Sequence, residues 1–136
     1  MDKVWEQSEE ALEAGHRLFH TVEHGDLETL RDVFAEDAVV WHNTDEKLVD
    51  VETSIRNLQK IRSLATVFRY DDVRRDPTPQ GFVQRHTLIV EMPDGRTIRD
   101  LCCCVCAVEN GRITRMDAYH DSAATGAMPH RSGAPR

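Results

Sequence analysis

The sequence lacks an apolar run long enough to cross a lipid bilayer. Its longest apolar-rich stretch, residues 101–108, has the length of one strand, whereas a membrane-spanning helix needs about 20 residues. The first residues also lack a basic start followed by an apolar stretch, so we expect no signal peptide and a cytoplasmic protein.

Basic residues are in the minority, with 17 Lys and Arg against 24 Asp and Glu and a formal net charge of −7. An acidic chain is repelled by phosphate backbones and by anionic lipid surfaces. We therefore expect neither nucleic acid nor a membrane as the main partner. The 136 residues, of which 40% are hydrophobic and 30% charged, are typical of one ordinary globular domain.

The cysteines lack the spacing of a disulfide framework or of a zinc site. All four lie between Cys102 and Cys106, whereas disulfide frameworks use spread cysteines and zinc sites use pairs of ligands on turns. Because alternate residues of a strand face opposite sides, Cys102, Cys104 and Cys106 share one face and Cys103 lies on the other. We expect reduced, largely buried thiols and no metal; a metal or redox role is the alternative.

Hydrophobic periodicity predicts helices first and strands afterwards. Helices are predicted at residues 4–24, 27–34 and 50–64, with Gly25 as a stop and Asp26 as a cap between the first two. Strands are predicted at residues 38–42, 66–73, 82–91, 97–108 and 113–120. This order is typical of an α+β fold, with helices on one face of a strongly curved antiparallel sheet that encloses a cone-shaped pocket. We expect one domain over residues 1–121 and a flexible C-terminal tail over residues 122–136.

Three stretches of the sequence resemble a known superfamily. They are His24-Gly25-Asp26-Leu27 with residues 33–40 (VFAEDAVV), residues 41–43 (WHN) and residues 109–121 (ENGRITRMDAYHD). Together they resemble the NTF2-like superfamily, in its ketosteroid isomerase and SnoaL-like polyketide cyclase branch, over about residues 4–121. The resemblance implies a pocket for a small molecule and a homodimer paired through the outer sheet face. Isomerases, dehydratases, epoxide hydrolases, cyclases and non-catalytic members share this fold, so the fold alone does not give the function.

His42 is the first candidate for chemistry. Ketosteroid isomerases use a general-base aspartate with a tyrosine and a protonated aspartic acid. Through the resemblance, the position of the base falls on His42, that of the tyrosine on Leu18 and that of the protonated acid on Cys104. None of the three isomerase residues is therefore present in this chain. An unperturbed imidazole titrates near pH 6.5, which suits a general base. A buried structural histidine is the alternative, and if Trp41 and Asn43 faced inward, His42 would face outward.

Arg85 is a candidate electrophile. Limonene epoxide hydrolase-like members use an Asp-Arg-Asp set with an asparagine; Arg85 matches the arginine and Asn43 the asparagine, whereas the aspartates fall on Thr87 and Ala118. A charge on the concave face must be paired, and Asp100 on the neighbouring strand is in position to pair with Arg85. The guanidinium would then polarise a carbonyl or bind a carboxylate. A structural ion pair at the pocket rim is the alternative.

His120 is in strand phase with Met116 and Ala118, which predicts a position on the pocket wall. There it could pair with His42 or with a substrate oxygen; an edge histidine that faces solvent is the alternative. The histidines at positions 16, 20 and 24 follow helical spacing and could bind a metal, but we expect a solvated helix face.

These residues favour a cofactor-free enzyme that acts on a small, mostly apolar carbonyl or hydroxyl compound. The reaction would be proton abstraction leading to isomerisation, dehydration or cyclisation, with His42 as base and Arg85 or His120 as electrophilic partner. The residues expected to contact the substrate or wall the pocket are Leu18, Val22, Trp41, Asn43, Leu58, Thr87, Ile89, Asp100, Cys102, Cys104, Met116 and Ala118. A non-catalytic ligand-binding or assembly domain of the same fold is the alternative.

Overall fold

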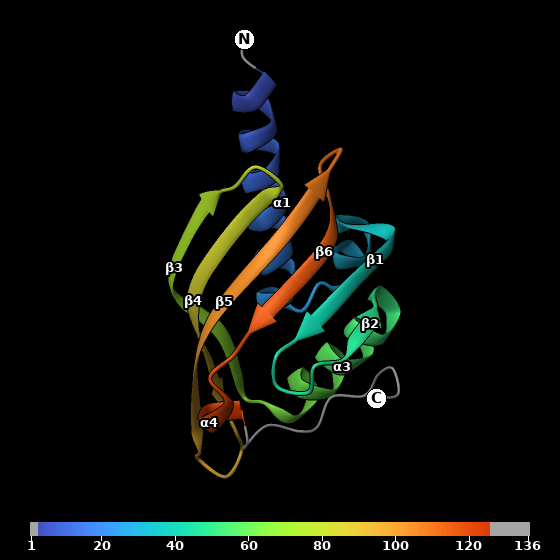
Figure 1. Ribbon diagram of the computed structural model, residues 1–136. Helices are drawn as coiled ribbons and strands as arrows, with labels where there is room; N and C mark the ends of the chain where they lie inside the picture. Colours follow the sequence, from blue (N-terminus) through green and yellow to red (C-terminus); the bar gives the residue numbers. More distant parts are fainter. Residues whose placement is uncertain (1–2, 126–136) are drawn as a thin grey trace.

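Helices and one curved sheet form the α+β fold that the sequence predicts (Figure 1). The computed structural model describes residues 3–125. In chain order the elements are α1 (Lys3–His24), α2 (Leu27–Val33), β1 (Phe34–His42), β2 (Leu48–Asp50), α3 (Val51–Leu64), β3 (Val67–Pro77), β4 (Gly81–Glu91), β5 (Thr97–Glu109), β6 (Arg112–Tyr119) and α4 (Ser122–Thr125). Figure 1 shows α1 behind the sheet, with its N-terminal turns extending beyond the sheet edge.

The strands lie in the order β2-β1-β6-β5-β4-β3, and the sheet is left open. The neighbours from β3 to β6 are antiparallel, as predicted. β1 instead runs parallel to β6, with Val40 opposite Met116 and His42 opposite Ala118. Because parallel strands end at the same edge of a sheet, this pair brings the end of β1 beside the end of β6.

Short polar residues set the helix boundaries. The carboxylates of Asp26 and Asp50 accept the backbone N–H groups of Thr29 and Thr53, at 3.3 and 2.8 Å, and so cap α2 and α3. Gly25 ends α1 with a φ of 73°, a conformation that glycine adopts without strain. The structure differs from the prediction in three strands: β1 begins at residue 34 rather than 38, β3 ends at residue 77 rather than 73, and the short strand β2 was not predicted.

The core lies between the helices and the concave face of the sheet. Its main cluster joins Leu18 of α1 and Leu30 of α2 with Val40, Phe82 and Cys104 of the sheet. The predicted alternation of the cysteines is confirmed, since Cys102, Cys104 and Cys106 are buried, the fourth is half-buried, and all are free thiols. Burial of these small side chains stabilises the sheet against the helices.

Part of the predicted tail is ordered. Residues 122–125 form α4, in which Ala124 packs against a second cluster that includes Leu88 and Val90. The remainder of the predicted tail, residues 126–136, lies outside the described residues. Among the helices of residues 3–125, none has both the length and the apolar character needed to cross a bilayer.

Candidate active site

A cavity of about 330 Å³ lies between the concave sheet face and the helices. Apolar side chains make up most of its wall; examples are Leu18 and Val22 from α1 and Leu58 from α3. Its polar lining residues are His42, Thr44, Asp45, Ser54, Asn57, Tyr70, His86, Asp100, His120 and Ser122. An apolar cavity with a small number of polar groups is typical of a binding site for a small organic molecule.

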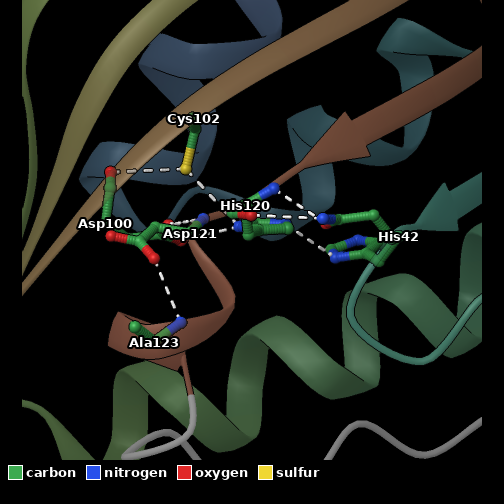
Figure 2. A network of polar contacts seen from close by, with 7 residues as sticks. His42, Asp100, Cys102, His120, Asp121 and Ala123 are labelled. Atoms are coloured by element: carbon green, nitrogen blue, oxygen red, sulfur yellow. Dashed lines mark hydrogen bonds and ion pairs between the residues drawn. The ribbon is translucent and has the colours of Figure 1, made fainter.

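Three side chains on this wall form a continuous polar chain (Figure 2). Asp100 Oδ2 lies 2.6 Å from His120 Nδ1, and His120 Nε2 lies 2.9 Å from His42 Nδ1. The two imidazole rings are nearly parallel, with an interplanar angle of 15°. Asp100 comes from β5, His42 from the end of β1, and His120 from the residue after β6. The parallel pairing of β1 with β6 therefore brings the two histidines together.

Backbone contacts hold this chain in place. The Asn43 side chain accepts the His120 backbone N–H at 2.8 Å and donates to the His120 carbonyl at 3.1 Å. Asp100 Oδ1 accepts the backbone N–H of Asp121 at 2.8 Å. Each end of the His120 segment is thus fixed by hydrogen bonds, which restricts where its ring can point.

The environment of Asp100 favours its ionised form. Burial raises the pKa of the Asp100 carboxyl, but the hydrogen bond and charge of His120 and the backbone N–H of Asp121 outweigh burial, so the pKa lies below its ordinary value. The carboxylate is fully buried. At neutral pH it is therefore an acceptor only, and His120 Nδ1 must carry the proton between them.

Two of the proton arrangements that satisfy both contacts in the chain matter for a base. If both histidines are neutral, His120 Nε2 accepts a hydrogen bond from His42 Nδ1–H, and His42 Nε2 then carries a lone pair. If His120 is an imidazolium, its Nε2 donates to His42 Nδ1 beside the Asp100 carboxylate. The first arrangement gives His42 the form of a base, and the second is the state that a base reaches after taking up a proton.

His86 is a further cavity residue that the sequence analysis did not select. Arg75 Nε donates to Gln84 Oε1 at 2.8 Å, which turns the Gln84 amide nitrogen toward His86 Nδ1, 3.0 Å away. His86 Nδ1 is therefore the acceptor and Nε2 carries the proton. Gly15 leaves room for the arginine, because a Cβ there would lie 2.7 Å from Arg75 Cδ.

His86 stays neutral at physiological pH. Burial, with a smaller effect of the neighbouring His120, lowers the pKa of His86 to about 4. Phe19 and Tyr70 pack edge-on against its ring, with centroids 5.2 and 4.6 Å away. A neutral imidazole with a fixed N–H is a hydrogen-bond donor for a carbonyl or an oxyanion.

The described residues also contain one group with metal-ligand chemistry. Ligand atoms of Asp100, Cys102 and His120 lie within 4.8 Å of one another. The 2.6 Å contact between Asp100 and His120 is shorter than the roughly 3.3 Å that separates two ligands of a tetrahedral zinc ion. Burial also raises the pKa of the Cys102 thiol well above its ordinary value. The group is therefore arranged as a hydrogen-bonded proton chain, and the absence of a metal stays a prediction.

The structure brings most of the predicted site residues to one cavity. Those that line it are Leu18, Val22, His42, Leu58, Asp100, Cys102, Cys104, Met116, Ala118 and His120. Their roles in binding or catalysis stay predictions. Trp41 lies elsewhere and packs against Tyr119, with ring centroids 5.4 Å apart, while Asn43 holds the backbone of His120. The side-chain direction that was open is thereby settled, because His42 faces the cavity and Trp41 does not.

The predicted placement of Arg85 on the cavity wall is wrong. Arg85 is exposed and lies opposite Cys103, on the outer face of the sheet, where it lines a different hollow together with Thr87. Ile89 shares their strand phase and is buried, but it does not line the cavity. The predicted pairing of Arg85 with Asp100 is also wrong, since Asp100 pairs with His120. The inner face of β4 carries Gln84 and His86, which hydrogen-bond to each other through Gln84 Nε2 and His86 Nδ1, so strand alternation alone favoured the opposite face.

Comparison with protein-family models agrees with this geometry. A SnoaL-like domain matches residues 16–116. The chain therefore belongs to the SnoaL-like family of NTF2-like proteins, as the resemblance implied. A comparison with curated proteins gives no matching sequence.

Solved structures share the fold at low sequence identity. IdmH from Streptomyces antibioticus, proposed to be a polyketide cyclase, has a TM-score of 0.76 and 20% identity, with 86% of this chain and 96% of that chain covered. An LEH-like epoxide hydrolase from M. tuberculosis has a TM-score of 0.73 and 18% identity, with 86% of each chain covered. A SnoaL-like protein from Shewanella denitrificans OS-217, also proposed to be a polyketide cyclase, has a TM-score of 0.70 and 13% identity, with 85% of this chain and 93% of that chain covered. These identities establish the fold and leave the reaction open.

Proposed function

We propose that the chain is a cofactor-free enzyme that removes a proton from a small, mostly apolar carbonyl or hydroxyl compound. The observation that carries this proposal is the hydrogen-bonded chain from the buried Asp100 through His120 to His42, on the wall of a mostly apolar cavity. The match to the SnoaL-like family and the fold shared with cyclases and an epoxide hydrolase support a small organic ligand. Isomerisation, dehydration and cyclisation are the reactions that such a proton transfer can begin.

Proton removal follows from the two arrangements of the chain. His42 Nε2 takes a proton from carbon or oxygen of the substrate while its Nδ1 proton moves to His120 Nε2. The positive charge then lies on His120, 2.6 Å from the buried Asp100 carboxylate, and the ion pair between them stabilises it. The proton can return to another atom of the substrate, which gives an isomer, or assist the departure of a hydroxyl as water.

The negative charge left on the substrate needs a donor. His86 provides a neutral N–H on the same cavity wall, with its tautomer fixed by Gln84. In a cavity that excludes most water, a fixed donor aimed at a developing oxyanion stabilises it strongly. We therefore assign His86, in place of Arg85, as the electrophilic partner in this proposal.

The proposal includes a homodimer in the cytoplasm. Large apolar side chains are exposed on the outer face of the sheet, where Leu101 is 64% and Tyr119 46% accessible. Exposed apolar residues clustered on one face favour an interface with a second copy.

Replacement of His42 by alanine tests the proposal. A suitable probe is nitrobenzisoxazole, a small apolar compound whose C–H proton is removed by a base as the N–O bond breaks and a coloured phenolate is released. Turnover should fall by about 10²–10⁴, whereas the free energy of unfolding should fall by only about 1 kcal/mol. His20→Ala, at an exposed position of α1, is the matched control. Unchanged turnover per folded molecule in the His42 variant would instead favour a non-catalytic ligand-binding domain.

A further inference from the structure

One buried hydroxyl on the cavity wall has no hydrogen-bond partner. Among the residues from 3 to 125, the only buried side-chain polar atom without a partner is Ser54 Oγ, in the first turns of α3. Ser54 also lines the cavity. A buried polar group without a partner is destabilising and uncommon in folded proteins, so it calls for a physical reason.

Two other helical hydroxyls of this chain are satisfied by their own helix. Thr21 Oγ1 donates to the Arg17 carbonyl at 2.8 Å, and Ser63 Oγ donates to the Lys60 carbonyl at 2.7 Å. Such bonds to the preceding turn are the usual solution for serine and threonine in helices. Ser54 does not make one. The Ser54 side chain lines the cavity, and asparagine at position 57, one turn further along α3, lines the same cavity.

We propose that Ser54 binds a second oxygen of the ligand, a hydroxyl or carbonyl separate from the one that reacts at His42. The reactive chain belongs to the sheet, whereas Ser54 comes from α3, so one ligand would be held by polar groups on opposite sides of the cavity wall. The inference rests on the proposed function for the ligand class, and it adds that the ligand carries two oxygen functions on an apolar body.

Binding of matched probe compounds tests this inference. The probes are naphthol and a set of dihydroxynaphthalene isomers, which differ by one hydroxyl on the same apolar body. Calorimetry should show that at least one diol binds the unmodified chain more tightly than naphthol, and that Ser54→Ala weakens this diol by about three- to tenfold while leaving naphthol unchanged. Ser63→Ala, on the same helix but outside the cavity, should change neither affinity.

The stability of the ligand-free variant separates a binding role from a structural one. Removal of an unsatisfied hydroxyl should leave the melting temperature of Ser54→Ala equal to or above that of the unmodified chain, whereas a structural hydroxyl would lower it. Ser63→Ala serves as the reference for the change in melting temperature. It combines the higher helix propensity of alanine with the loss of the exposed hydrogen bond from Ser63 to the Lys60 carbonyl. If naphthol binds but no diol gains affinity, or if Ser54→Ala binds every diol normally, the inference is overturned while the cavity assignment stands. If no compound binds, the ligand class of the proposed function fails and this inference fails with it.

Discussion

Replacement of Asp100 by asparagine should reverse the proton arrangement of the whole polar chain. The asparagine oxygen can still accept the Asp121 N–H that lies 2.8 Å from Asp100 Oδ1. Its amide nitrogen then takes the place of Asp100 Oδ2, which lies 2.6 Å from His120 Nδ1 in the unmodified chain. An amide nitrogen can only donate to His120 Nδ1. His120 Nδ1 becomes the acceptor, its Nε2 carries the proton, and His42 Nδ1 must accept. His42 Nε2 is thereby protonated and has no lone pair with which to act as a base.

The expected magnitudes differ for stability and for activity. Both hydrogen bonds of residue 100 survive as neutral bonds, so the cost is the lost charge assistance, about 1 kcal/mol in the free energy of unfolding. Turnover of nitrobenzisoxazole should fall much further, by about 10²–10⁴, because the wrong tautomer removes the base. Urea unfolding gives the first quantity and steady-state kinetics the second. Nitrogen NMR of the histidine rings reports which nitrogen carries the proton.

One result would refute this reasoning. If NMR shows that the His42 and His120 protons have exchanged positions in Asp100→Asn, yet turnover per folded molecule is within a factor of about two of the unmodified chain, then His42 Nε2 is not the base. Asp100→Ala is less informative, because it leaves the Asp121 N–H without its carboxylate acceptor.

Three other predictions follow from burial and exposure. A thiol reagent should label the half-buried Cys103 quickly and the other three cysteines only on denaturation. Burial raises the pKa values of those three thiols, that of Cys104 to about 12, which makes them unreactive in the folded chain. Cys103→Ser should remove the fast labelling phase, and fast labelling of two or more thiols would contradict the prediction. Between the ordinary pKa of 6.5 and the folded pKa of about 4 for His86, the unfolded chain binds a proton that the folded chain excludes. The free energy of unfolding should therefore fall as pH drops through this window, by up to about 3 kcal/mol. His86→Gln should flatten this slope, whereas the exposed His16→Gln should keep it. Sedimentation should give a dimer that Leu101→Asp converts to a monomer, and an unmodified chain that sediments as a monomer would contradict the proposed assembly.

Sequence patterns predicted the order of most elements because the first three helices and most strands carry a clear local signal, whereas α4 was not predicted. Asp26 and Gly25 mark a helix boundary by their own chemistry, and the apolar residues of α1 and α3 repeat at helical spacing. The parallel pairing of β1 with β6 has no local signal, because it joins residues about eighty positions apart. This pairing is also what places His42 beside His120.

The site was harder to predict because polar residues face both sides of β4. Arg85 and Thr87 alternate with Gln84 and His86, so the strand has no uniformly apolar face that would identify the interior. The deciding feature is Arg75 on the neighbouring strand, which satisfies Gln84. That partner lies nine residues away, across the turn between β3 and β4. A spacing of polar residues at positions 84 and 86 opposite an arginine is the signal that could have favoured His86.

A comparison of single and double variants tests the central claim most directly, namely that Asp100, His120 and His42 act as one proton chain. Turnover of nitrobenzisoxazole is measured for His42→Ala, Asp100→Asn and the double variant, each normalised to the folded fraction from urea unfolding. If Asp100 acts only through His42, the double variant should be no slower than His42→Ala alone, since residues that act as a unit give strongly non-additive effects. Losses that multiply in the double variant, or an His42→Ala variant that turns over like the unmodified chain, would contradict the account.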